Sequence, residues 1–346
     1  MRICIITVYN SNNYGAFFQA FALKEYLEMD GHEVFFLKHK ARNLTKMTLK
    51  KIVKKISHLD NFGYLFQIRK MEVFRKSIFN FKECFLQDLE KMDVILWGSD
   101  EIWNVARKNV RKFPFFFGVN VNCQKKIAYA PSVNNATYKD FESHLNYINL
   151  IKNIDEISVR DQHSKKVLSH FIKDKEISVV VDPTLLHDVS FYVKYMKKKE
   201  FPYKYILVYS YGTHLKNDII GAIKLYANEK RMKIISILEE FPWCDESPSV
   251  TPFEMLNYFQ KAELIITDTF HGTIFSIIFN KNFIITSCHN TKVVDLTKEV
   301  TLSDRILSEQ YEISELAEKP IDYESINLLI EYKRKISKEF INKVIN

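Results

Sequence analysis

The sequence predicts an α/β protein with two Rossmann-like halves, because short apolar segments of strand length alternate with helical patterns along the chain. Its 346 residues exceed the usual size of one domain. A polar stretch at 188–204 interrupts the alternation. We therefore expect an N-terminal domain over 1–190 and a C-terminal domain over 205–312. An amphipathic helix within 313–346 would return to the first half.

The first half begins with a strand at 1–8, a turn rich in Asn, a helical pattern at 17–29 and a strand at 33–37. This β-α-β order predicts a parallel sheet. The turn lacks the GxGxxG pattern, so a dinucleotide fingerprint is absent. Its Asn and Gly residues either bind a ligand or only turn the chain and cap the helix.

Strands and helices continue to alternate through the rest of both halves. Further strands are expected at 92–97, 126–130, 157–161, 178–181, 205–211, 233–238, 264–266 and 283–285. Helices are expected at 138–150, 162–171, 219–230, 251–259, 272–279 and 322–344. No internal repeat or low-complexity tract interrupts this pattern.

The cysteines and the apolar segments indicate a cytoplasmic protein. The five cysteines are odd in number and widely spaced, without a CxxC pair, which argues for a reducing compartment and against a zinc site. The apolar segment at the start is too short for a signal peptide. No apolar run reaches the length of a membrane span.

Positive charge is concentrated in one segment. Residues 38–76 carry twelve Lys or Arg against two acids, while the whole chain has a net charge of +8. We expect a basic helical insertion at about 40–80. Its segment Lys46–Lys55 is either a solvated helix face or a surface that meets membrane phospholipid or a lipid-diphosphate substrate. Nucleic acid is disfavoured, because no aromatic-basic RNA motif or DNA-reading pattern accompanies the charge.

Three segments contain residue types that suit ligand binding or catalysis. They include Gly15, Gly98 and Gly272, three of only eight glycines in the chain. The richest is the turn 267–272, TDTFHG, between an apolar strand and an apolar helix. A helix amino terminus offers backbone N–H groups and a positive dipole end, which favour an anion. Open α/β sheets also bind ligands at the carboxyl ends of their strands. The composition of this turn therefore predicts a binding site rather than a purely structural turn.

Five segments in order resemble the polysaccharide pyruvyl transferase family. They are YNSNNYGAFFQAFAL, WGSDEIWN, ISVRDQHS, VDPTLL and ITDTFHGTIFSIIFNKNF. The resemblance covers about residues 1–310. It implies a glycosyltransferase-B type fold, in which two Rossmann-like domains face a cleft. It also implies transfer of pyruvate from phosphoenolpyruvate onto two hydroxyls of a sugar, with no separate cofactor, in making capsule, exopolysaccharide or cell-wall polymers.

His271 is our candidate general acid, because imidazole titrates near working pH and phosphoenolpyruvate must be protonated at C3. The alternative is a histidine hydrogen-bonded within its turn. Arg160 resembles the arginine of the family, and its fork suits a carboxylate or phosphate. A structural ion pair of Arg160 with Asp161 or Asp182 is the alternative.

The remaining donor-side candidates are Gly272, Thr273 and Ser276, which would bring the helix amino terminus and hydroxyls toward phosphate. Ser276 is alternatively a buried helical serine. Some branches of the family have an arginine where this chain has Thr269. Because threonine carries no charge, the cation for this end of the donor must then come from Lys292, or alternatively from Lys281 or Arg305.

On the acceptor side, Asp100 would orient or deprotonate a sugar hydroxyl, unless it only caps the next helix. The resemblance places Asn13, Tyr14, Gly15 and Gln19 along the acceptor, which would be a free or lipid-linked sugar. A glycosyltransferase of the same fold, using a nucleotide sugar, is the alternative function. A non-catalytic sugar-binding or membrane-scaffold protein is a third, and it predicts that His271 and Arg160 are dispensable.

Overall fold

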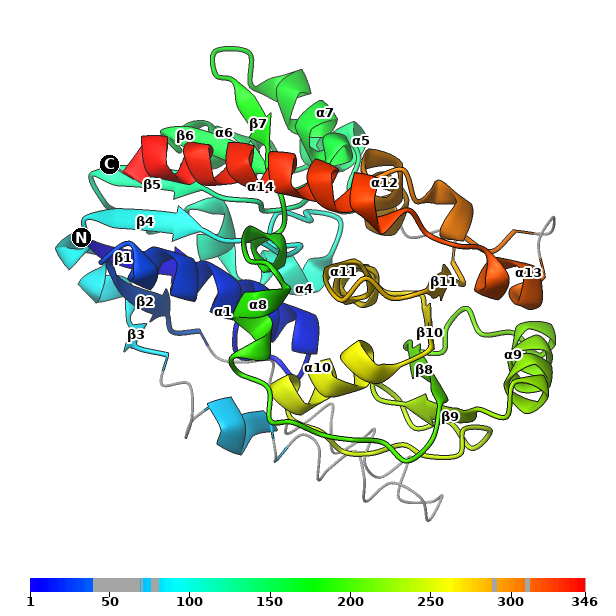
Figure 1. Ribbon diagram of the computed structural model, residues 1–346. Coiled ribbons are helices and arrows are strands. Elements are labelled where there is room, and N and C mark those ends of the chain that lie inside the picture. The colour runs from blue at the N-terminus through cyan, green and yellow to red at the C-terminus, as the bar shows by residue number, and fades with distance from the viewer. Residues whose placement is uncertain (40–68, 70, 76–80, 288–290, 309–311, 346) are drawn as a thin grey trace, which may run out of the picture. The chain divides into compact units, whose positions relative to one another are not determined.

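The structure is a computed structural model that describes residues 1–39, 69, 71–75, 81–287, 291–308 and 312–345. The chain forms two compact units (Figure 1). Unit 1 comprises the described residues within Met1–Arg42, Phe79–His187 and Ile330–Asn346, and unit 2 those within Asn43–Ile78 and Asp188–Leu329. The basic segment Lys46–Lys55 lies outside the described residues, so its contact with a membrane stays a prediction.

Unit 1 is built on a parallel sheet which, in the described residues, has seven strands in the order β3-β2-β1-β4-β5-β6-β7. The strands are β1 (Arg2–Ile6), β2 (Glu33–Leu37), β3 (Glu83–Cys84), β4 (Val94–Trp97), β5 (Lys125–Ala128), β6 (Glu156–Val159) and β7 (Ile177–Val179). The chain runs outward from β1 to β3 and then crosses back to β4 on the other side of β1. The strand order therefore reverses between β1 and β4, where such sheets bind ligands.

The central strand β4 of unit 1 is apolar along its whole length, with the sequence VILW, because helices bury both faces of a parallel sheet. The helices are α1 (Tyr14–Met29), α4 (Lys108–Arg111), α5 (Tyr138–Glu142), α6 (Leu145–Lys152), α7 (Gln162–Phe171) and the last part of α14 (Tyr323–Ile345). Three short 3-10 helices, η1 (Leu86–Lys91), η2 (Pro114–Phe117) and η3 (Pro183–Leu186), complete the described part of the unit.

Unit 2 contains a smaller parallel sheet, whose described strands follow the order β11-β10-β8-β9. The strands are β8 (Tyr205–Tyr209), β9 (Lys233–Ser236), β10 (Leu264–Thr267) and β11 (Phe283–Ile285). Around them lie α8 (Val189–Val193), α9 (Asn217–Glu229), α10 (Pro252–Lys261), α11 (Phe270–Ile278), α12 (Thr291–Glu299), η4 (Ser303–Arg305) and α13 (Ile313–Glu318). The chain passes from β9 back across β8 to β10, so this sheet reverses its order between β8 and β10.

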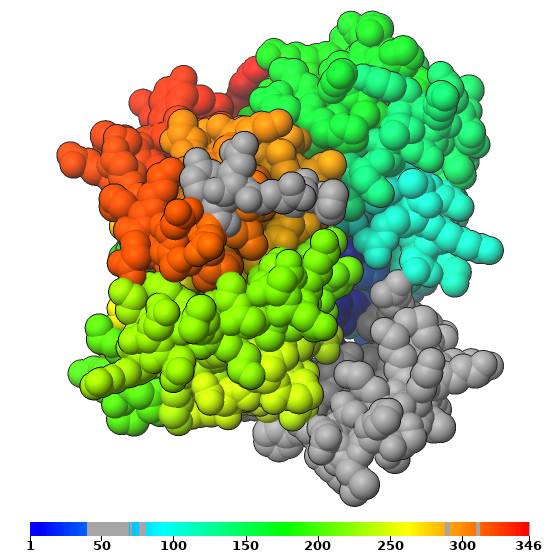
Figure 2. All heavy atoms as spheres, turned by 90° about the vertical axis from the view of Figure 1, so that its right-hand side faces the viewer, coloured from blue at the N-terminus to red at the C-terminus, as the bar shows by residue number. Residues whose placement is uncertain are grey.

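One face of the unit 2 sheet packs on α9 and α13. Figure 2 shows the outer side of these helices, with the orange segment that contains α13 beside the yellow-green segment that contains α9. Tyr226 of α9 donates a hydrogen bond to Glu318 of α13, and Lys230 forms an ion pair with the same carboxylate. The buried core beneath them is aliphatic and includes Val208 and Ile266.

The structure confirms the α/β class and its parallel sheets, while several helix boundaries differ from the expected ones. α1 begins at Tyr14, before the expected 17, because the Asn13 side chain accepts a hydrogen bond from Ala16 N and caps the helix. The expected helix at 138–150 is two helices, α5 and α6, which are separated at Ser143 and His144. The strand β3 and the helices α4, α8, α12 and α13 were not expected.

The C-terminal part of α14 packs on unit 1, beside the sheet (Figure 1). Ser337 accepts a hydrogen bond from Val181 N, and Arg334 donates one to Leu185 O. Asn342 accepts a hydrogen bond from the Tyr26 hydroxyl on α1. The first two contacts fix the segment that follows β7, and the third holds α14 against α1.

His187 ends that segment, and it predicts a pH dependence of stability. Its Nε2 bonds to Ala22 O at 2.9 Å, and burial lowers the pKa of His187 to about 4. In the unfolded chain a histidine titrates near about 6.5. Because the folded state disfavours the protonated ring, stability is highest above about pH 6.5 and falls as the pH drops toward 4.

We expect the free energy of unfolding to fall by about 2 kcal/mol between pH 7 and pH 5 because of His187. His187→Gln should lose this part of the pH dependence, because its amide does not titrate. Urea unfolding of both proteins at the two pH values measures the difference. Equal pH dependence in both would show that His187 contributes nothing.

Within the described part of the chain, no helix is both long and apolar enough to cross a membrane.

Candidate functional site

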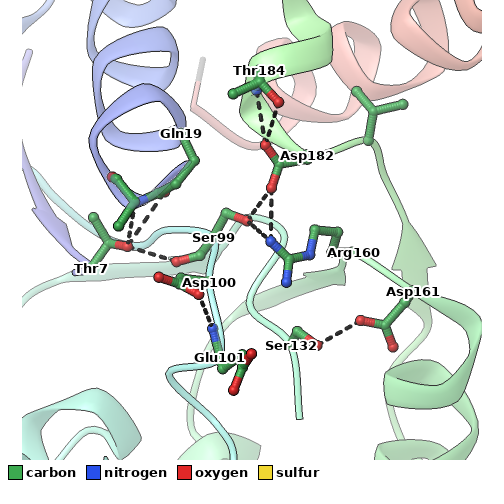
Figure 3. Close-up of polar contacts among 12 residues, drawn as sticks. Thr7, Gln19, Ser99, Asp100, Glu101, Ser132, Arg160, Asp161, Asp182 and Thr184 are labelled. Carbon is green, nitrogen blue, oxygen red and sulfur yellow. Dashed lines mark hydrogen bonds and ion pairs between the residues drawn. The ribbon is translucent and has the colours of Figure 1, made fainter. Parts of the chain in front are cut away.

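The unit 1 cluster, which we define as Thr7, Gln19, Ser99, Asp100, Arg160 and Asp182, lies at the carboxyl ends of the strands (Figure 3). Thr7 follows β1 and Ser99 follows β4, the two strands between which the order reverses. The Thr7 hydroxyl donates to Ser99 O at 2.6 Å, which joins the two strand ends. The cluster therefore occupies the place where an open α/β sheet binds ligands.

Arg160 follows β6 and forms a buried ion pair with Asp182, with 2.8 Å between Nη1 and Oδ2. The side chains are 2% and 0% exposed. Of the two partners that the sequence left open, the structure selects Asp182; Asp161 instead caps α7 by accepting from Ser164 N. Burial opposes the charge of Arg160, but Asp182 and the nearby Asp100 outweigh it and raise the pKa of the guanidinium. Arg160 therefore stays charged.

Asp100 has a left-handed backbone with a φ of 88°, which costs energy in a residue with a side chain. Its carboxylate accepts a hydrogen bond from Glu101 N at 2.8 Å, and its carbonyl accepts one from Ser132 N at 2.9 Å. The alternative that Asp100 only caps the next helix is wrong, because α4 begins only at Lys108. Strained residues of this kind concentrate at functional sites.

The four acceptor-side candidates lie together at the start of α1, although three of them are buried. Asn13 is exposed and caps the helix, whereas Tyr14 and Gly15 are buried in its first turn. Gln19 is also buried, and its amide donates to Thr7 Oγ1, Val8 O and Ala16 O. This geometry gives Gln19 a structural role, and the contact of these residues with an acceptor stays a prediction.

The unit 2 turn, Thr267–Gly272, lies at the carboxyl end of β10, beside the end of β8. The Thr267 hydroxyl donates to Tyr209 O at 2.7 Å, and Asp268 accepts from Tyr211 N at 3.4 Å. Thr269 is the cap of α11, because its hydroxyl accepts from Gly272 N at 2.9 Å. The expected helix start at Gly272 is therefore wrong by two residues, and α11 begins at Phe270.

Gly272 is required by packing. A Cβ atom at this position would lie 2.2 Å from the Thr267 hydroxyl, 2.6 Å from the Thr269 hydroxyl and 2.8 Å from the Tyr209 ring. Its N–H donates to Thr269, so the cap uses the group that was expected to approach a phosphate. The structure thus explains the glycine without a ligand.

His271 lies in the first turn of α11, half-buried, at the end of the unit 2 sheet where the strand order reverses. Its ring packs edge-on against Phe270, with 5.3 Å between centroids. Lys292, in the first turn of α12, places its ammonium 6.0 Å from the centroid of the same Phe270 ring. An imidazole and a cation therefore both lie near one aromatic ring, an arrangement that suits an anionic ligand.

The other two proposed cations, Lys281 and Arg305, donate hydrogen bonds to backbone carbonyls elsewhere in unit 2. Lys281 follows the C-terminal end of α11 and donates to Gln260 O, and burial lowers the pKa of its ammonium. The Arg305 guanidinium is buried and donates to Phe283 O, Lys319 O and Leu316 O. Of the three candidates, Lys292 is the one beside the unit 2 turn.

The hydroxyls of Thr273 and Ser276 point back along α11. Thr273 donates to Thr269 O at 3.0 Å and Ser276 to Gly272 O at 2.8 Å, and both side chains are fully buried. Ser276 is therefore a buried helical serine, which was one of the two alternatives that the sequence left open. The geometry does not support contact of either hydroxyl with the donor, which stays a prediction.

Sequence reasoning placed Ser99 in a polar segment at a strand end but gave it no role, and it missed Thr7 and Tyr209 as parts of the unit 1 cluster and the unit 2 turn. Thr7 directly follows β1, Tyr209 ends β8 and Ser99 lies two residues after β4, each at the same edge of its sheet as the residues that were named. Aligning the carboxyl ends of all predicted strands would have found them, because the ends of parallel strands meet at one edge.

Two parallel sheets of Rossmann type, each with polar residues where its strand order reverses, define an α/β protein of the glycosyltransferase-B type. The sequence assigns the chain to one family with this fold. Residues 13–290 match the polysaccharide pyruvyl transferase family model, and the chain belongs to this family of transferases.

Solved structures show the same fold at low sequence identity. A Listeria monocytogenes protein described as a UDP-N-acetylglucosamine 2-epimerase has a TM-score of 0.51 and 10% identity, over 96% of this chain and 90% of that one. S. aureus MnaA, solved with UDP, has a TM-score of 0.51 and 12% identity, over 97% and 90%. Another UDP-N-acetylglucosamine 2-epimerase has a TM-score of 0.51 and 12% identity, over 98% and 95%. No curated protein matches the chain in sequence.

Proposed function

We propose that the protein transfers pyruvate from phosphoenolpyruvate onto two hydroxyls of a sugar and forms a cyclic ketal. The acceptor would belong to a cell-surface polysaccharide, such as a capsule or exopolysaccharide, or to its lipid-linked precursor, and the reaction would take place in the cytoplasm. Membership of the polysaccharide pyruvyl transferase family supports this proposal. The observation that carries it is the position of His271, in the first turn of α11 at the end of the sheet.

The reaction begins with a proton transfer. The His271 imidazolium donates a proton to C3 of phosphoenolpyruvate, so that C2 becomes an oxocarbenium-like centre. One sugar hydroxyl adds to C2 and loses its proton. The C2–O bond to phosphate then breaks, phosphate leaves, and the second hydroxyl closes the ring and loses its own proton. Of the two protons released, one protonates the departing phosphate and one restores His271.

The charges of phosphoenolpyruvate require fixed cations. Lys292 beside Phe270 supports the binding of one anionic group, because its ammonium lies near the first residue of α11. Lysine supplies the charge but not the bidentate fork of an arginine. As the family resemblance implies, we also propose Arg160 for the donor; its guanidinium is charged and lies at the end of the unit 1 sheet, where it is buried against Asp182.

We assign Asp100 to the acceptor, as the group that first receives one of the two hydroxyl protons and then releases it to the departing phosphate. Asp100→Asn should lower the rate of pyruvyl transfer by about 10²-fold or more, because general base catalysis contributes about that much. The fold should be unaffected, since asparagine tolerates a left-handed backbone and its carbonyl can accept from Glu101 N. Turnover and melting temperature of the purified variant measure both effects. Normal turnover in a folded Asp100→Asn protein would remove Asp100 from the mechanism.

Thermal unfolding with added ligands tests the function itself. Phosphoenolpyruvate should raise the melting temperature, because a ligand that binds only the folded state stabilises it. Assays with phosphoenolpyruvate and lipid-linked or nucleotide-linked sugars should then release phosphate and form a ketal. Stabilisation by a uridine nucleotide alone, without transfer of pyruvate, would favour the glycosyltransferase alternative instead.

A further inference from the structure

Asp182 carries a buried carboxylate that the proposed chemistry does not use. Its Oδ1 accepts from Thr184 N at 3.1 Å and from the Thr184 hydroxyl at 2.7 Å. Its Oδ2 accepts from Arg160 Nη1 at 2.8 Å and from the Ser99 hydroxyl at 2.9 Å. A carboxylate has about four acceptor sites, so these donors occupy it. Asp182 is therefore not placed to act as a base.

Ser99 connects this ion pair to the turn that contains Asp100. Its hydroxyl donates to Asp182 and accepts from Arg160 Nη1 at 3.2 Å, so it touches both charged groups. Figure 3 shows Ser99 beside the Arg160 guanidinium, with Asp100 next to it in the chain. The Ser99 carbonyl accepts from Thr7, which fixes the same residue to the end of β1. Ser99 therefore links the ion pair to the end of β1 and to the left-handed backbone of Asp100.

The segment that carries Asp182 is itself fixed on both sides. Val181 N donates to Ser337 on α14, and Val181 O accepts from the Tyr129 hydroxyl at 3.0 Å. Pro183 follows at once and restricts the backbone of η3. The orientation of the Asp182 carboxylate is thus set by β5, η3 and α14 together.

We propose that Asp182 and Ser99 are positioning residues, which hold the Arg160 guanidinium and the Asp100 turn in one geometry during pyruvyl transfer. This inference rests on the proposed function. Without either contact the guanidinium remains in the unit 1 cluster and still attracts an anion, but its direction is no longer fixed. A displacement of about 1 Å at a reacting group can cost about 10²-fold in rate. The effect should therefore appear in kcat rather than in binding of phosphoenolpyruvate.

Two variants and one control test this on the full chain. Asp182→Asn removes the charge with little change of shape, and Ser99→Ala removes the bridging hydroxyl and leaves every charge in place. Ser158→Ala is the matched control, because Ser158 is a buried serine that donates to Ala128 O, on the strand that precedes Arg160. For each protein we would measure kcat, the KM for phosphoenolpyruvate and the melting temperature, with kcat expressed per folded molecule.

We expect kcat to fall about 10²-fold in Asp182→Asn and about 10-fold in Ser99→Ala, with KM changed by less than about threefold. Ser158→Ala should keep the wild-type kcat. A role in stability alone would lower the melting temperature and leave kcat unchanged, and that result would overturn the inference. If Asp182→Asn does not fold, Ser99→Ala decides the question in the same way. Absence of pyruvyl transfer by the wild-type protein would overturn the proposed function and this inference with it.

Discussion

His271→Gln should lower the rate of pyruvyl transfer by about 10³-fold, because glutamine cannot donate a proton to C3 and acid catalysis contributes about 10² to 10⁴. Binding of phosphoenolpyruvate should persist, since the α11 amino terminus and Lys292 remain in place. The two quantities are separable. Turnover is measured by ketal formation, and binding by the rise in melting temperature that phosphoenolpyruvate causes.

His170→Gln provides the control for this experiment. His170 lies in the last turn of α7 in unit 1, against the rings of Tyr138 and Phe171, and belongs to neither cluster. It should keep the wild-type rate. If His271→Gln also kept that rate, another group would have to supply the proton, and the turn 267–272 would be structural.

Gly272→Ala should destabilise the protein by about 3 kcal/mol, because the added methyl group has no space. It would meet the hydroxyls of Thr267 and Thr269 and the ring of Tyr209, all closer than a real Cβ atom approaches its neighbours. A loss of this size lowers the melting temperature by roughly 6 to 12 °C in a domain of ordinary size. Urea or thermal unfolding of the purified variant measures it.

Gly221→Ala is the matched control, with an effect of the opposite sign. Gly221 lies within α9, and a Cβ atom there would meet nothing within 4 Å. Alanine should stabilise this helix by about 0.5 to 1 kcal/mol, because it loses less conformational entropy on folding. If both variants were destabilised equally, the crowding around Gly272 would not be the cause.

The sequence predicted the alternation of strands and helices and placed the candidate residues at strand ends, because apolar segments and turn residues are local signals. It did not predict where α1 and α11 begin. Those starts depend on side-chain caps at Asn13 and Thr269, which extend each helix into a segment that looked like a turn. Boundaries set by one hydrogen bond are weak in the sequence pattern.

The role of Gly272 shows a second kind of limit. A glycine before a helix, next to hydroxyls and a histidine, looked like a phosphate-binding residue. The structure shows that it is crowded by Tyr209, which comes from a strand 63 positions earlier in the chain. The sequence offered Asp161 and Asp182 as partners of Arg160 and could not choose between them, because the choice depends on the pairing of β6 with β7. Contacts between distant segments cannot be read from local patterns.

The burial of the Arg160–Asp182 ion pair determines how this pair responds to dissolved salt. Dissolved ions screen charges that water can reach, whereas these two side chains are almost fully enclosed. The electrostatic attraction between the two side chains should be nearly the same at low and at high salt concentration. Sensitivity of the reaction to ionic strength would then arise at charges that water reaches, such as the half-buried Lys292.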